Sequence, residues 1–113
     1  MSNEFRASRD VIIRTTNFRA ATQFYERVLG LQVARRSASL VGFEAGAFRL
    51  YVEDGPGHGP VFDFLVPDLQ AAKSALLSAG CTVLEEDPAV PRCYIRDPYG
   101  LVFNIEQRPP LLA

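Results

Sequence analysis

The chain has 113 residues, of which 48% are hydrophobic and 22% are charged, and its formal net charge is −1. These values are typical of one globular domain with its own core and exclude a disordered chain. The near-neutral charge, without runs of Lys or Arg, argues against nucleic acid or a membrane surface as partner. The apolar runs are too short to span a membrane and the first residues lack a signal segment, so we predict a cytoplasmic protein.

The first half of the chain predicts a strand, a helix and three more strands. β-Branched residues favour an extended backbone over residues 10–15. Thr16 or Asn17 then offers a side-chain oxygen as N-cap, and Gly30 stands where a helix needs a left-handed C-terminal residue. Three strands are expected at about residues 31–36, 40–44 and 48–53.

A similar pattern follows after a stretch rich in Gly and Pro, residues 54–60, which we expect to be a loop. Residues 61–66 predict a strand, and Asp68 is a suitable N-cap for a helix that ends at Gly80. A strand over residues 81–85 and two more strands complete the second half.

The last two strands form a predicted hairpin around Asp97, Pro98 and Gly100. Pro98 has the φ value of the second position of a type I turn, Asp97 can bond back to the turn backbone, and Gly100 takes the final position. Apolar and polar residues alternate on both sides, which is typical of strands with one buried face. The buried set is expected to be Cys93, Ile95, Leu101, Phe103 and Ile105.

The two halves align as an internal repeat with a period of about fifty residues. Asn17 then matches Asp68, Gly30 matches Gly80, and Val33 matches Val83. Each copy reads βαβββ, so we predict an α+β fold in which two tandem modules form a curved mixed sheet with helices on its convex side. The whole chain, 1–113, is one domain, with modules at about residues 9–54 and 60–108.

Strand alternation assigns side chains to the two faces of this sheet. The helix-facing side takes Val11, Ile13, Thr15, Phe48, Leu50, Val52, Phe62, Phe64 and Val66. The concave side gathers aromatic, charged and amide groups, which favours a ligand pocket, although an open solvated face with exposed charge pairs is the alternative. The candidate ligand-binding residues are Arg14, Arg49, Tyr51, Asp63, Arg92, Tyr94, Asn104 and Glu106.

Two segments resemble the vicinal oxygen chelate (VOC) superfamily of glyoxalase I, bleomycin-resistance proteins and extradiol dioxygenases. Residues 21–31 are similar to its first helix, A-x-x-F-Y-x-x-x-L-G, and the Asp97-Pro98-Tyr99-Gly100 turn with its following strand is similar to its last hairpin. The resemblance implies two βαβββ modules per chain, pairing of modules across a homodimer, and a small-molecule cavity enclosed by the concave sheets.

The resemblance also implies where a catalytic metal would bind. The family's ligand positions on its first, fourth, fifth and eighth strands fall here on Asp10, Tyr51, Val61 and Asn104. A valine cannot bind a metal, a neutral phenol is a poor ligand and an amide a weak one. The sole histidine, His58, lies in the predicted loop. We therefore predict no metal, no cofactor and no catalytic residue.

The cysteines support the same expectation. Cys81 and Cys93 occupy core-facing strand positions, and in a reducing compartment we expect buried thiols rather than a disulfide or a metal site. The sequence also lacks a Gly-rich phosphate loop after a strand and a nucleophile elbow.

We therefore expect a small-molecule-binding protein that resembles the metal-free bleomycin-resistance branch and sequesters an aromatic or polar ligand, for example an antibiotic, in a dimer cavity. Tyr51 and Tyr94 would stack on rings, and charged side chains would fix polar groups. One alternative is a metal-dependent lyase, isomerase or dioxygenase with an atypical site. The other is a structural or regulatory dimer without a ligand.

Overall fold

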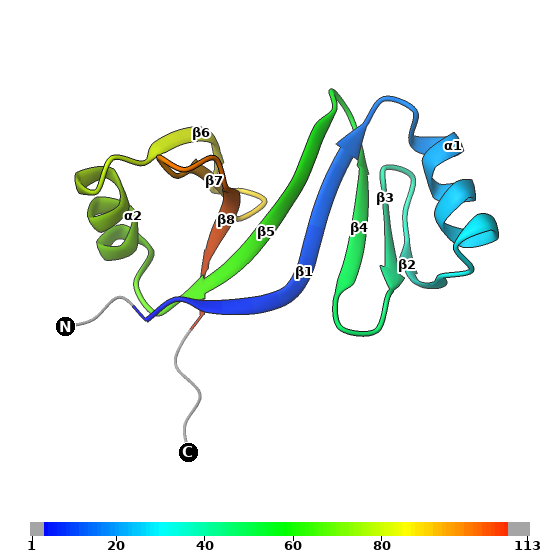
Figure 1. The fold of residues 1–113 in the computed structure, drawn as a ribbon, viewed down its shortest axis with the longest axis horizontal. Coiled ribbons are helices and arrows are strands. Elements are labelled where there is room, and N and C mark those ends of the chain that lie inside the picture. The colour runs from blue at the N-terminus through cyan, green and yellow to red at the C-terminus, as the bar shows by residue number, and fades with distance from the viewer. Residues whose placement is uncertain (1–3, 109–113) are drawn as a thin grey trace, which may run out of the picture. The chain divides into compact units, whose positions relative to one another are not determined.

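A computed structural model describes residues 4–108 of the chain. The described residues form two compact units, coloured along the chain in Figure 1. The first unit is Arg9–Val61, and the second begins at Phe62 and also takes in the chain up to Ser8. Because the two units have separate cores, each is described by itself.

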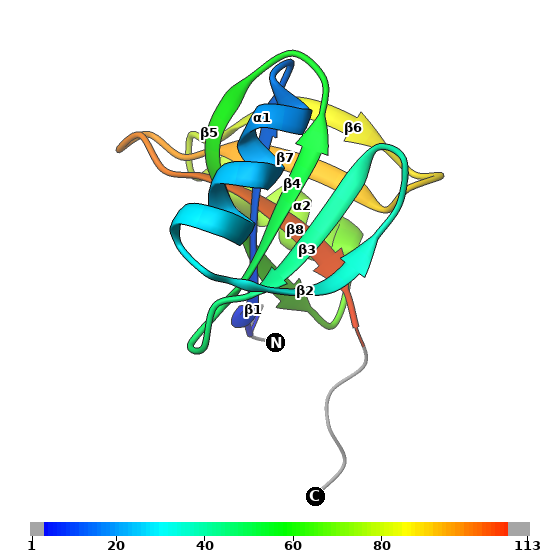
Figure 2. The same ribbon diagram turned by 90° about the vertical axis from the view of Figure 1, so that its right-hand side faces the viewer.

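The first unit is a four-stranded mixed sheet with a helical segment on one face (Figure 2). Its strands follow the order β2-β3-β4-β1, with β1 parallel to β4 and the other neighbours antiparallel. The elements are β1 (Arg6–Thr15), α1 (Phe18–Gln23), η1 (Phe24–Val28), β2 (Gln32–Arg36), β3 (Leu40–Glu44) and β4 (Arg49–Asp54).

Alternation along β3 and β4 builds the core of this unit. Val41 and Phe43 point to the same face as Leu50 and Val52, and all four are buried. The helical segment covers them with the ring of Tyr25, whose centroid lies 6.0 Å from that of Phe43. The sheet face that carries Leu50 and Val52 therefore packs against the helical segment, as predicted.

The expected single helix has an irregular second half. After α1 the chain widens into the short π-helix η1, where the Leu29 N–H donates to the carbonyl of Phe24 five residues earlier, at 3.2 Å. Gly30 then ends the segment with a φ of +69°. Gly30 therefore ends the helical segment with the left-handed backbone that the sequence predicts, a conformation that glycine adopts more readily than other residues.

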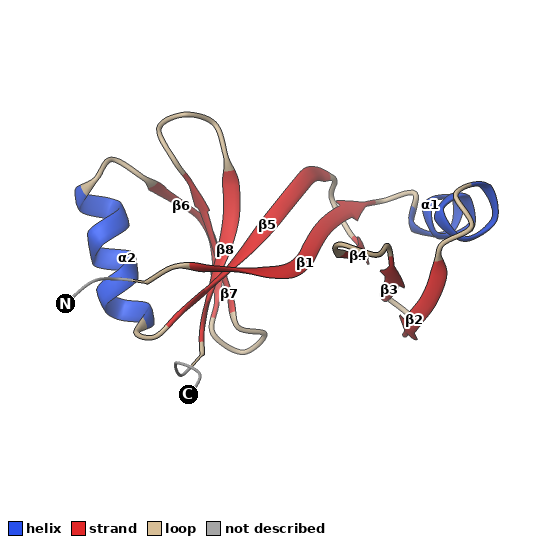
Figure 3. Cartoon of the chain, turned by 60° about the horizontal axis from the view of Figure 1, so that its bottom comes forward, coloured by secondary structure: helices blue, strands red, loops and turns tan. Residues whose placement is uncertain are grey.

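The second unit repeats the arrangement with the strand order β5-β8-β7-β6, in which β5 and β8 are parallel and the other neighbours antiparallel. Figure 3 shows α2 beside these strands. The elements are β5 (His58–Val66, in this unit from Phe62), α2 (Leu69–Ser78), β6 (Thr82–Asp87), β7 (Arg92–Arg96) and β8 (Val102–Gln107).

The second core lies between α2 and the sheet. Ala72 of α2 is fully buried against Val66, Ile95 and Ile105. Asp68 caps the helix by accepting a hydrogen bond from the Ala71 N–H at 3.0 Å, as the sequence predicts. The order βαβββ occurs in both units, so the predicted α+β fold is confirmed.

Several predicted boundaries were wrong. The first strand begins at Arg6 rather than residue 10, and the expected loop at 54–60 shrinks because β5 already begins at His58. Extended backbone accommodates the fixed φ of Pro60, so a Gly/Pro-rich composition did not prevent a strand there.

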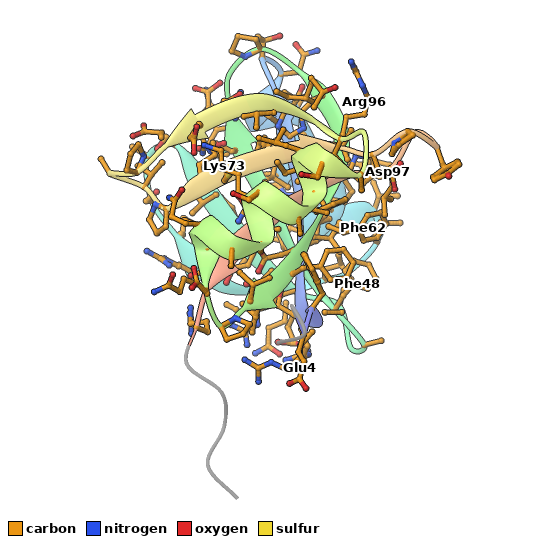
Figure 4. All side chains as sticks on the ribbon, turned by 90° about the vertical axis from the view of Figure 1, so that its left-hand side faces the viewer. Glu4, Phe48, Phe62, Lys73, Arg96 and Asp97 are labelled. Carbon is orange, nitrogen blue, oxygen red and sulfur yellow. The ribbon has the colours of Figure 1, made fainter. Side chains whose placement is uncertain are left out.

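Three side chains assigned to the core are partly exposed: Phe48 by 41%, Phe62 by 43% and Leu101 by 38%. Phe48 and Leu101 each precede a strand, and Phe62, labelled in Figure 4, lies earlier on β5 than Val66, the residue of that strand in the core with Ala72 of α2. Alternation indicates the face of a sheet but not which part of that face a helix covers. None of the helices within residues 4–108 is long and apolar enough to cross a membrane.

Candidate functional site

The second unit carries a hydrogen-bonded row of polar side chains on the sheet face turned away from α2. Phe103 and Ile105 pack in the α2-facing core, so Asn104 between them points to the opposite face. Its Nδ2 donates to Asp63 Oδ1 at 2.9 Å, and Ser8 Oγ donates to Asp63 Oδ2 at 2.8 Å. Asp63 and Asn104 are both buried. This buried carboxylate is therefore held by charge-assisted hydrogen bonds rather than left unpaired.

An aromatic ring lies next to this row. Tyr94 on β7 pairs directly with Asn104 on β8 and is buried. The Arg92 guanidinium carbon lies 5.3 Å from the centroid of the Tyr94 ring, which is cation–π distance. Arg92 also donates to Glu85 at 2.9 Å. The row thus combines a ring, a cation and a buried carboxylate on one face.

The corresponding face of the first unit holds Arg14, Arg49 and Tyr51. Arg14 is paired with Glu53 at 3.1 Å, and the two residues are direct neighbours on β1 and β4. The pKa of Arg49 is raised above its ordinary value, first by a hydrogen bond with Tyr51 and then by the charges of Tyr51 and Asp10. These interactions hold the guanidinium in its charged form beside the Tyr51 ring.

A glycine makes room for that ring. A Cβ atom at Gly42 would lie 2.8 Å from Cε1 of Tyr51, closer than side chains approach one another. Gly42 and Tyr51 are register partners on β3 and β4, so the ring lies flat over the neighbouring strand. The sheet of the first unit therefore presents an aromatic surface on the face opposite its core.

The positions that would bind a metal in the VOC superfamily do not fit one here. Asn104 has a single acceptor oxygen, and this oxygen accepts the Cys93 N–H at 2.7 Å. Val61 has no ligating atom, and the neutral phenol of Tyr51 is a poor metal ligand. Within the described residues no three His, Cys, Asp or Glu side chains form a group that could hold a metal ion.

The eight predicted site residues fall into the two units. Arg14, Arg49 and Tyr51 belong to the first, and the other five belong to the second. Glu106 lies next to Arg108, whose Nη2 donates to it at 3.0 Å. His58, the sole histidine, contacts the neighbouring carbonyl of Gly59 through Nδ1 at 2.8 Å.

Sequence reasoning missed two members of the site. Ser8 was left out because the first strand was expected to begin at residue 10, although the alternation of Arg6, Ser8 and Asp10 was a usable signal. Glu85 faces Tyr94 because a register shift between Val83 and Glu85 changes the face of later residues of β6. A bulge of this kind leaves no clear trace in the sequence.

The family model described as a glyoxalase-like domain matches residues 10–106. A glyoxalase/bleomycin resistance protein/dioxygenase superfamily member from Vibrio splendidus 12B01 is 16% identical, with a TM-score of 0.66 over 93% of this chain and 100% of that chain. A hypothetical protein from Bacillus halodurans C-125 is 12% identical, with a TM-score of 0.65 over 96% of this chain and 98% of that chain.

Homoprotocatechuate 2,3-dioxygenase from Brevibacterium fuscum is 17% identical, with a TM-score of 0.69. The alignment covers 98% of this chain but only 39% of the dioxygenase chain. At such low identities these structures show a common fold and nothing more. No curated protein sequence matches the chain.

Proposed function

The chain belongs to the glyoxalase-like domain family, and from this premise we propose that it binds a small organic molecule without the help of a metal ion. The observation that carries the proposal is the state of Asn104. Both polar atoms of its side chain are used within the sheet, Nδ2 by Asp63 and Oδ1 by the Cys93 N–H. This residue therefore positions neighbouring groups instead of offering an oxygen to a metal.

Rings and charges on the helix-free faces suit recognition of an aromatic ligand with polar substituents. In the first unit, Tyr51 offers a ring surface beside the guanidinium groups of Arg14 and Arg49. In the second unit, taken by itself, the Arg92 guanidinium lies over the buried ring of Tyr94. Arg49 Nε is buried, has no hydrogen-bond partner among the described residues, and lies 3.8 Å from the nearest oxygen of Glu44. A donor left without an acceptor is costly, so an acceptor atom of the ligand would satisfy it.

Under this proposal the ligand is held and not converted. Sequestration requires complementary contacts but no general acid, base or nucleophile. An aromatic antibiotic is one ligand of this chemistry, and resistance by sequestration is the biological role that would follow. The similarity to a superfamily that includes bleomycin-resistance proteins supports this choice of probes.

A thermal-shift screen in EDTA with a panel of aromatic antibiotics, bleomycin among them, tests the proposal. A ligand at a hundred times its Kd adds about 2.7 kcal/mol to the stability of the folded state. The variant Tyr51→Leu should abolish the shift, because the Tyr51 ring lies over Gly42 on the face of the first unit that also carries Arg49. The matched variant Tyr99→Leu should retain it, because Tyr99 is 93% exposed in the hairpin turn.

Two results would contradict the proposal. One is a panel in which no compound raises Tm, which favours a structural or regulatory role. The other is a shift that appears only with a divalent metal, which favours a metal-dependent lyase, isomerase or dioxygenase with ligands other than Asn104.

A further inference from the structure

A cavity of about 230 Å³ lies in the second unit, on the α2 side of the sheet. Cys93 and Ile105 line it, and both belong to the core that α2 covers. Asn104, the neighbour of Ile105, points to the other face and does not line it. Arg92 and Glu106 of the polar face also border the cavity, because they stand where β7 begins and β8 ends. The cavity therefore lies on the α2 side of the sheet and shares only these two bordering residues with the polar face.

The start of α2 is held in place beside this cavity. Gln107 Oε1 accepts the Leu69 N–H at 2.8 Å and joins the first turn of α2 to the end of β8. One turn further on, Lys73 Nζ donates to both carboxylate oxygens of Glu86, at 2.9 and 2.7 Å, and joins α2 to β6 (Figure 4). These two exposed links connect α2 to β8 and to β6, the strands that carry Ile105 and Glu86 of the lining.

The lining is apolar with acceptors at its edge. Leu69 and Ile105 supply aliphatic surface, and Pro88 and Pro91 contribute rings from the β6–β7 turn. Burial raises the pKa of Cys93, and the nearby charge of Glu86 raises it further, so the sulfur is a neutral thiol. The polar groups at the edge include the carboxylates of Glu86 and Glu106. Each carboxylate is paired with a cation, Glu86 with Lys73 and Glu106 with Arg108, and Arg92 also borders the cavity. The edge therefore has no excess of negative charge, but carboxylate lone pairs can still accept a hydrogen bond from a ligand.

The volume of the cavity limits the size of the ligand that it can hold. An engineered apolar cavity of about 150 Å³ holds benzene, and drug-sized ligands occupy pockets of about 300–1,000 Å³. The present volume of about 230 Å³ lies between them and suits one or two fused rings. We propose that the cavity between α2, the β6–β7 turn and β8 is a second binding site for an uncharged mono- or bicyclic aromatic molecule that carries one hydrogen-bond donor.

Indole is a probe of this class, and the site can be tested by titrating it into the full chain while recording amide and methyl NMR spectra. We expect saturable binding with a Kd on the order of millimolar or tighter, and nuclear Overhauser effects between indole protons and the Ile105 methyl groups. Indole-3-carboxylate, which has the same rings and an added carboxylate, should bind at least about tenfold more weakly, because its charge would lose water against an apolar lining whose bordering cation, Arg92, is already paired with Glu85.

A variant pair locates the site. Gln70 is exposed and borders the cavity from the first turn of α2, so Gln70→Trp should fill the opening and weaken indole binding by at least about tenfold. Ser78→Trp, at the far exposed end of the same helix, should leave the Kd within about twofold of the wild type.

Three results would overturn the inference: no saturable binding of indole, Overhauser contacts to the Tyr94 ring instead of Ile105, or equal Kd values for the two tryptophan variants. The contact measurement uses the wild-type chain and does not depend on the folding of either variant. The inference does not rest on the polar face, so it stands or falls separately from the proposed function.

Discussion

Asn104 and Asp63 are direct neighbours on the parallel strands β8 and β5, and Asn104 Nδ2 donates to Asp63 Oδ1 at 2.9 Å. On its other side the same amide accepts the Cys93 N–H from β7 at 2.7 Å. The side chain therefore links three strands of the second unit. Where the VOC superfamily would place a metal ligand on the last strand, this chain has a cross-strand link.

Removal of the Asp63 carboxylate should destabilise the protein. In Asp63→Ala, the Ser8 hydroxyl and the Asn104 amide each lose an acceptor in a buried place. An unsatisfied buried group costs about 1–3 kcal/mol, so we expect the free energy of unfolding to fall by at least that amount in urea titrations. Asp54→Ala, a loss of an exposed carboxylate at the end of β4, is the control and should cost about 0.5 kcal/mol or less. Equal losses would mean that the link is not stabilising.

We expect substitutions at two adjacent residues of the hairpin turn to differ in their effect on stability. Gly100 has a φ of +105°, so Gly100→Val forces a β-branched residue into a left-handed backbone and should cost about 1–3 kcal/mol. Tyr99 is 93% exposed, so Tyr99→Ala should leave Tm nearly unchanged. Differential scanning calorimetry of the two variants measures both effects. Equal melting temperatures would contradict the turn assignment.

The turn also shows what the sequence could predict. Asp97, Pro98 and Gly100 specify local geometry through their own chemistry, and Asp97 Oδ1 accepts the N–H groups of Tyr99 and Leu101 at 2.9 Å as expected. The caps of α2 and the alternation of β3 and β4 were predictable for the same reason, since each depends on residues close in the chain. The βαβββ order followed from these local signals and the repeat.

Features that depend on distant residues were not predictable. The Ser8–Asp63 hydrogen bond joins residues 55 positions apart, and no local pattern predicts it. The face of Glu85 depends on a register shift in β6, and the exposure of Phe62 depends on which strands α2 covers. Polar links and irregular pairings of this kind are set by tertiary packing rather than by periodicity.

The Cys93 thiol should be protected from alkylation. It is 2% exposed and its pKa is raised above the ordinary 9.0, first by burial and then by the charge of Glu86. In Cys81→Ser, where Cys93 is the remaining cysteine, iodoacetamide at pH 8 should react on the order of a hundredfold more slowly with the native than with the urea-unfolded chain. Mass spectrometry gives both rates, and similar rates would contradict the burial of Cys93.

The same raised pKa predicts a pH dependence of stability. Between pH 9 and the folded-state pKa of Cys93, the unfolded chain releases the thiol proton while the native protein keeps it. The stabilisation is therefore complete below about pH 9 and is lost as the pH rises through the folded-state pKa. In urea titrations above pH 9, the free energy of unfolding should fall less steeply with pH in Cys93→Val than in the wild type. An equally steep fall in the variant would show that Cys93 does not cause the pH dependence.

We expect the chain to be a homodimer in solution. Phe24, Val28 and Leu29 of the first unit are exposed by 47%, 68% and 53%, an apolar surface that favours association with a second copy. Specific interfaces bury on the order of 1,200 Å² or more, enough for a stable pair at micromolar concentration. Light scattering should give twice the chain mass of 12.5 kDa. A single-chain mass at tens of micromolar would contradict the expectation.

Under our proposal the chain binds its ligand without a metal, and calorimetric titration of the chelator-stripped protein is the decisive experiment. Zn²⁺, Ni²⁺ and Mn²⁺ are titrated separately, and the compound with the largest thermal shift is then titrated in EDTA and again with each metal. We predict no metal binding tighter than about millimolar, because Val61 has no ligating atom and the Asn104 amide oxygen, a weak ligand, already accepts the Cys93 N–H. We also predict one Kd for the compound under all conditions. A tightly bound metal, or a compound that binds only when a metal is present, would contradict the claim.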